Sequence, residues 1–173
     1  MGLDMYLYKK TYIGANYDHR KVKGEINLTY GDNDTPFKIN TNRVSEISEQ
    51  VAYWRKANAI HGWMVENIQN GEDDCKEYWI STEQLKELIE NCKHDIKYIE
   101  TLQVKNDEEY PDYKTFLDVD ETKLKLPTQS GFFFGSTSYD IWYLNSLKDT
   151  IEMLLPLLEE VNDNSDFYYR SSW

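Results

Sequence analysis

The stretch RVSEISEQVAYWRKANAIHGWMVENIQ, residues 43–69, decides the expected fold of the middle of the chain. Its large apolar side chains recur at steps of three and four residues, at Val44, Ile47, Val51, Trp54, Val65 and Ile68. Side chains at this spacing share one face of an α-helix. The sequence therefore predicts one long helix from about Arg43 to Gln69, ended by Asn70-Gly71, which tolerate the left-handed conformation.

Two polar residues interrupt the apolar face of this expected helix. Asn58 and His61 continue the same spacing, and Arg55 borders the face three residues before Asn58. A buried polar group without a hydrogen-bond partner costs roughly 1–3 kcal/mol. The group therefore either forms a satisfied structural network or lines a pocket, and the sequence leaves both readings open.

The rest of the chain predicts short strands and two further helices. Strands are expected at residues 3–8, 25–30, 37–40, 78–80, 116–119 and 167–170. A second helix begins after the capping pair Ser81 and Gln84, and a third runs over residues 141–161 with a kink or break at Pro156. The three Phe residues between Gly131 and Gly135 are expected to be buried. We expect an α+β fold over residues 1–173 as a single domain, with a small, mostly antiparallel sheet and about three helices packed on it.

Charge and composition narrow the classes of function. The net charge is −12, which disfavours general nucleic-acid binding and adsorption to anionic membranes. Cys75 and Cys92 lack the spacing of a zinc site. No stretch approaches the length of an apolar membrane span. We expect a cytoplasmic protein with no metal, no cofactor and no membrane partner.

The best candidate site is a ligand pocket made from the first long helix, the Phe-rich turn and the C-terminal strand. Arg55 would pair with a phosphate or carboxylate, and Asn58 and His61 would hydrogen-bond a heterocycle or sugar. Gly135-Ser136-Thr137 resembles a helix N-terminus that could bind an anion or be capped in the ordinary way. The candidate ligand-binding residues are Trp54, Arg55, Asn58, His61, Trp63, Phe133, Ser136, Tyr169 and Arg170. No known catalytic template is complete, so no catalytic residue is assigned.

Several motifs resemble those of a widespread family of small phage and prophage proteins. They are the opening Met1-Gly2-Leu3-Asp4-Met5-Tyr6, the segment from Ala52 to Trp63, the segment from Leu126 to Ser136, and the closing Tyr169-x-Ser171-Ser172-Trp173. The resemblance implies a phage origin and no particular activity. A phosphoglycerate-kinase label used for some members is not supported, because the chain is too short for that two-domain enzyme.

A phage origin suggests three hypotheses. The first is a counter-defence protein that binds and sequesters a small nucleotide-type signalling molecule in the host cytoplasm, using aromatic stacking and arginine. The second is an acidic inhibitor of a host defence protein, which could imitate DNA. The third is a small enzyme that uses His61 as acid or base. The first hypothesis is preferred. Each of the three is compatible with a homo-oligomer.

Overall fold

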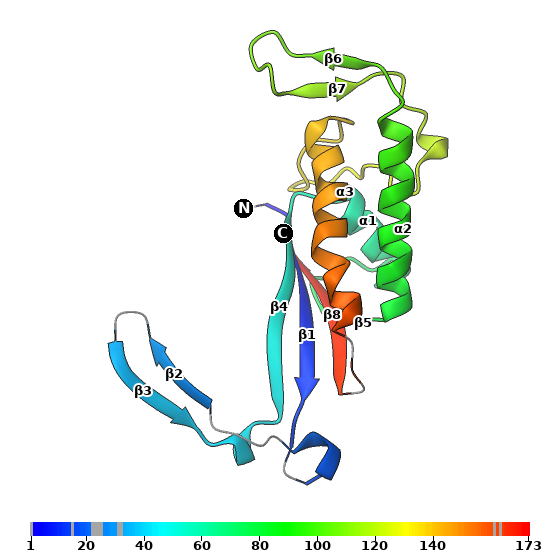
Figure 1. Cartoon of the computed structure of the whole chain (residues 1–173). Helices are drawn as coiled ribbons and strands as arrows, with labels where there is room; N and C mark the ends of the chain where they lie inside the picture. The colour runs from blue at the N-terminus through cyan, green and yellow to red at the C-terminus, as the bar shows by residue number, and fades with distance from the viewer. Residues whose placement is uncertain (1, 15, 22–25, 31–32, 161, 163) are drawn as a thin grey trace.

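The chain folds into one four-stranded antiparallel sheet with three helices on the same side (Figure 1). The computed structural model describes residues 2–14, 16–21, 26–30, 33–160, 162 and 164–173. The strands are β1 (Asp4–Tyr12), β4 (Glu46–Arg55), β5 (Glu77–Ile80) and β8 (Ser165–Ser172), in the order β4-β1-β8-β5. Asp4 lies opposite Ser172, so the two ends of the chain meet in neighbouring strands. The α+β prediction is confirmed.

The core lies between the sheet and the helices. Alternate residues of the strands, such as Met5 and Leu7 on β1 and Tyr169 on β8, are buried on the face toward the helices. The opposite face carries Tyr53 and Trp79, which are exposed. The sequence alternation of β1 and β8 therefore reflects a sheet with one covered face.

The helices are α1 (Asn58–Asn67), α2 (Thr82–Ile99) and α3 (Ile141–Leu154). The predicted capping box of α2 is confirmed, because Ser81 and Gln84 exchange side-chain and backbone hydrogen bonds. The predicted break at Pro156 is also confirmed, since α3 ends there and the short 3-10 helix η4 (Pro156–Glu159) follows. Three further 3-10 turns are η1 (Asp18–Arg20), η2 (Thr41–Arg43) and η3 (Glu121–Lys123).

Two hairpins stand apart from the main sheet (Figure 1). The first pairs β2 (Ile26–Tyr30) with β3 (Asn33–Ile39), which confirms both predicted strands, although residues 25, 31 and 32 lie outside the described residues. The second pairs β6 (Val104–Asn106) with β7 (Lys114–Phe116) near the start of α3. The strand predicted at 116–119 thus lies a few residues earlier in the chain.

The predicted single helix from Arg43 to Gln69 is wrong. Its first half is strand β4, and only Asn58–Asn67 is helical. The cause is a bulge: Leu7 pairs with Ala52 but Tyr8 pairs with Gln50, which leaves Val51 as an extra residue. The bulge interrupts the period of two, so apolar residues at 47, 51 and 54 mimic helical spacing.

The expectation that all three Phe residues are buried is also wrong. Phe134 is buried, Phe133 is half-buried, and Phe132 is 93% exposed. The segment is a turn in which the Phe134 amide donates to the Gly131 carbonyl at 3.2 Å. The Phe134 ring folds back over Gly131, where a Cβ would stand only 2.3 Å from the ring. The turn therefore orients only one of the three rings toward the core.

Candidate functional site

His61 lies at the centre of a closed network of side chains. Its Nδ1 is 2.8 Å from the Tyr169 hydroxyl, and its Nε2 is 2.9 Å from Oδ2 of Asp73. The side chain is fully buried, with the Phe134 ring edge-on against it. A neutral imidazole that donates from Nε2 to Asp73 and accepts at Nδ1 from Tyr169 satisfies both contacts. Nothing of His61 is left for a ligand.

Burial also sets the protonation state of this network. It lowers the pKa of His61, and the hydrogen bond to the Asp73 carboxylate opposes that shift only in part. Burial raises the pKa of the Tyr169 hydroxyl well above its usual value. The pair is therefore neutral near pH 7, which suits a structural role in the core.

Asn58 connects α1 to the Phe-rich segment. Its amide nitrogen donates to the carbonyls of Phe134 and Ser136 at 3.2 and 2.7 Å, and its oxygen accepts from the Gln129 amide at 3.1 Å. These bonds use the side chain's acceptor and both donors, and the residue is buried. For Asn58 and His61 the structure favours the network alternative.

A cleft of about 560 Å³ opens beside this network, between the end of β4, the first turn of α1, residues 128–138 and α3. It falls within the size range of small-molecule sites. The residues that line it are Arg55, Lys56, Ala57, Asn58, Ala59, Thr128, Gly135, Ser136, Ser138, Asp140, Trp142, Tyr143, Asn145, Ser146 and Asp149.

Arg55 and Lys56 are the cations of this cleft. They are exposed at the turn between β4 and α1, where Lys56 has a φ of 57°. The stem of Lys56 passes close to two glycines: a Cβ on Gly135 would stand 3.2 Å from its Cβ, and one on Gly2 would stand 3.5 Å from its Cε. No described carboxylate lies within ion-pair distance of either cation. The Arg55 guanidinium also interacts with the Tyr53 hydroxyl, which donates a hydrogen bond to Asp4. Neither cation is therefore neutralised by a direct ion pair with a described carboxylate.

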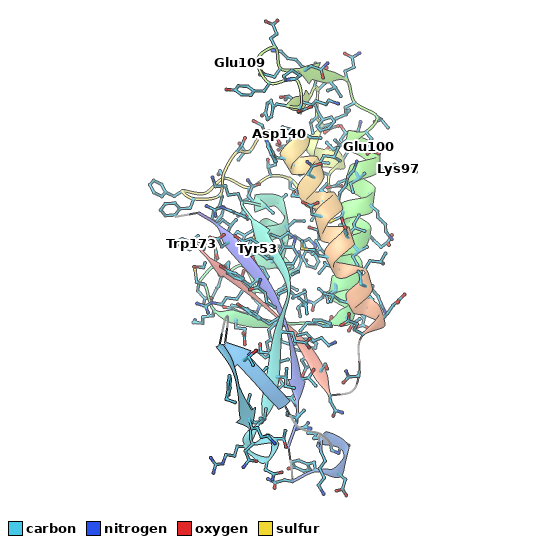
Figure 2. The ribbon with its side chains drawn as sticks, turned by 60° about the vertical axis from the view of Figure 1, so that its left-hand side comes forward. Tyr53, Lys97, Glu100, Glu109, Asp140 and Trp173 are labelled. Atoms are coloured by element: carbon cyan, nitrogen blue, oxygen red, sulfur yellow. The ribbon has the colours of Figure 1, made fainter. Side chains whose placement is uncertain are left out.

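The start of α3 forms the other side of the cleft. Asp140, labelled in Figure 2, caps the helix by accepting from the amides of Trp142 and Tyr143 at 2.9 and 3.0 Å, and it also accepts from the Tyr113 hydroxyl. The predicted helix start at Gly135-Ser136-Thr137 is therefore wrong, because the helix begins at Ile141 and its N-terminus is already satisfied by a carboxylate. Trp142 follows the cap with 69% of its surface exposed.

The nine predicted ligand-binding residues separate into two groups. Arg55, Asn58 and Ser136 line the cleft. The others do not: Trp54, Trp63, His61 and Tyr169 are buried in the core, Phe133 lies half-buried in the turn, and Arg170 is exposed on β8. Trp54 is held there by a 2.8 Å hydrogen bond from its Nε1 to Thr150.

Sequence reasoning missed Lys56, Trp142 and Asn145. A signal was present for Trp142, because the buried face of α3 is set by Leu144, Leu147 and Leu154, and Trp142 is a large aromatic outside that face. It also missed Asp73. Asp73 accepts from Nε1 of the C-terminal Trp173 at 3.1 Å as well as contacting His61.

Comparisons with protein-family models, with curated proteins and with solved structures found no match to this chain. Among the described residues, no three His, Cys, Asp or Glu side chains are grouped as ligands for a metal ion. None of the helices, over the part of the chain that is described, has the length and apolar character needed to cross a membrane.

Proposed function

We propose that this protein binds a small nucleotide-type molecule in the 560 Å³ cleft and sequesters it, as a phage-encoded counter-defence protein. The guanidinium of Arg55 and the ammonium of Lys56 would hold the phosphate, and the Trp142 indole would stack on the base. One observation carries the proposal: two adjacent cations, which have no ion-pair partner among the described carboxylates, line a cleft whose other wall presents a largely exposed tryptophan.

The two cations of the cleft belong to a chain that is acidic as a whole. The net charge is −12, yet the turn between β4 and α1 places Arg55 and Lys56 side by side. Among the described residues, the cleft lining also contains two carboxylates, Asp149 and the capping Asp140. Two neighbouring cations on one side of the cleft, with both carboxylates on the α3 side, favour a small anion held at the β4–α1 turn over a long phosphate backbone, which the acidic remainder of the surface repels.

Sequestration is supported over catalysis by the position of His61. The hypothesis of an enzyme needs that imidazole to reach a substrate, but it is fully buried and both of its nitrogens have partners. The counter-defence part of the proposal rests on the resemblance of the sequence motifs to phage proteins.

Titration calorimetry with nucleoside monophosphates tests the proposal, with the matching nucleosides as ligands that lack the phosphate. Arg55→Gln should weaken nucleotide binding by about 10- to 100-fold, the equivalent of one charge-assisted hydrogen bond, with the melting temperature unchanged. Arg43→Gln, which removes an exposed arginine on η2, is the matched control and should bind as the unmodified protein does. Equal affinity for nucleotides and nucleosides, or equal losses in both variants, would refute the proposed phosphate site.

The fate of the ligand separates sequestration from turnover. After incubation with a bound nucleotide, heat denaturation should release the same molecule intact, as measured by chromatography. Recovery of a cleaved product would replace the sequestration proposal with an enzymatic one.

A further inference from the structure

A second cleft adjoins the first across Trp142. It has a volume of about 680 Å³ and is lined by Asp107, Tyr110, Asp112, Tyr113, Ile141, Trp142 and Asn145. Trp142 and Asn145 also line the first cleft, so the two cavities share a wall. Its lining residues belong to the β6–β7 hairpin and to the start of α3, so the second cleft lies between these two segments.

The two clefts differ in charge. The first is lined by the cations Arg55 and Lys56 as well as by Asp140 and Asp149, whereas the described charged residues of the second are Asp107 and Asp112 alone. Asp107 uses Oδ1 to accept from the amides of Glu109 and Tyr110, which fixes the hairpin turn. Asp112 has no hydrogen-bond or ion-pair partner among the described residues. A ligand in both clefts would therefore present an anion to one and hydrogen-bond donors to the other.

The second cleft is also aromatic. Tyr110 is 64% exposed and Trp142 is 69% exposed, and both rings line the cavity. The Tyr113 hydroxyl donates to Asp140 at 2.8 Å, which ties the hairpin to the cap of α3. Exposed rings of this kind provide a stacking surface for a planar heterocycle.

We infer that the second cleft selects a guanine base, with the Asp112 carboxylate as the group that reads it. This inference rests on the proposed function, which places the phosphate at Arg55 and Lys56. Guanine carries a ring N–H beside an exocyclic amino group, and one carboxylate accepts from both at once. Hypoxanthine lacks the amino group, uracil has a single ring N–H, and adenine has no ring N–H on that edge. The ligand class is a guanine nucleotide, either free or as part of a small signalling molecule.

The test compares GMP, IMP, AMP and UMP by titration calorimetry. GMP should bind at least about tenfold more tightly than IMP, because IMP leaves one bond to a charged acceptor unmade. Asp112→Asn should bring the GMP and IMP affinities to within about threefold while leaving the affinity for AMP unchanged, because adenine has no ring N–H on that edge; an unchanged AMP affinity shows that the cleft is still folded. Glu109→Gln, on the same hairpin but outside the lining, should keep the preference for GMP; Glu109 is labelled in Figure 2.

The outcomes separate this inference from the proposed function. Equal binding of GMP and IMP, or a preference for GMP that survives Asp112→Asn, overturns the guanine inference and leaves the phosphate site standing. Failure of every nucleotide to bind overturns both.

Discussion

At the scale of single residues, His61 should make stability depend on pH. Its pKa in the folded protein is lowered from 6.5 by burial, so between that lowered value and pH 6.5 the unfolded chain binds more protons than the folded one. The free energy of unfolding should therefore fall as the pH drops below about 6.5 and level off below the folded pKa. His61→Gln should lose this part of the dependence. Urea denaturation of both proteins at pH 7.5 and 5.5 measures it, and an identical pH dependence in the two would contradict a neutral, buried His61.

Asn58 is predicted to stabilise the Phe-rich segment and not to contact a ligand directly. Asn58→Ala leaves the carbonyls of Phe134 and Ser136 and the Gln129 amide without their partner. The free energy of unfolding should drop by about 1–3 kcal/mol, as measured by urea denaturation. Asn106→Ala, at an exposed position on β6, is the control and should have little effect. If Asn58→Ala is as stable as Asn106→Ala, the hydrogen bonds of Asn58 do not stabilise the Phe-rich segment.

At the scale of elements, Asp95 holds the segment after η3 against α2. Its fully buried carboxylate accepts from the amides of Lys125 and Leu126 at 2.9 and 2.8 Å and from the Tyr143 hydroxyl of α3 at 3.3 Å. Asp95→Asn replaces one accepting oxygen with an NH₂ group that faces other hydrogen-bond donors. The free energy of unfolding should therefore fall by about 2–3 kcal/mol, measured as a lower urea midpoint. Glu90→Gln, on the exposed side of α2, should leave the midpoint unchanged; similar shifts in the two variants would show that this connection is unimportant.

Elements whose signals were local could be predicted from the sequence, and those set by long-range pairing could not. The capping box at Ser81, the break at Pro156 and the strands at both ends of the chain depend on a few neighbouring residues, and each is present. The sequence predicts a helix in place of strand β4 because the bulge at Val51 arises from pairing with β1. The β1 residue at the register shift, Leu7, lies 44 positions earlier in the chain. Propensity alone favoured a strand there, since Val51, Tyr53 and Trp54 suit a sheet better than a helix.

Three of the residues that the sequence indicates line the cleft, and the reasoning that pointed to them was partly mistaken. Polar residues at an expected apolar face did mark the region, and Arg55, Asn58 and Ser136 line the cleft. The sequence predicts His61 as a ligand group because nothing in it indicates the contacts of His61 with Asp73 in a loop and with Tyr169 on the last strand. Trp142 enters the site through the packing of α3 against the sheet, which the spacing of one helix does not reveal.

At the scale of the whole molecule, five tryptophans report on different regions. Trp142 stands at the two clefts, Trp79 is exposed on the uncovered face of the sheet, and Trp54 is buried with its Nε1 bonded to Thr150. A nucleotide bound as proposed should shift the indole N–H resonance of Trp142 and leave the resonances of Trp79 and Trp54 unchanged. The indole N–H signals of a ¹⁵N-labelled sample therefore distinguish the cleft from the uncovered face of the sheet, marked by Trp79, and from the core, marked by Trp54.

The most direct measurement is a titration of ¹⁵N-labelled protein with GMP, followed by the indole N–H resonances, with Trp142 assigned from its absence in Trp142→Phe. The Trp142 signal should shift progressively and saturate, while those of Trp54 and Trp79 stay in place, and Arg55→Gln should shift the titration to higher GMP concentrations. A saturable shift of Trp79 with Trp142 unmoved, or no shift of any indole signal at millimolar GMP, would contradict a nucleotide site between β4, α1 and α3.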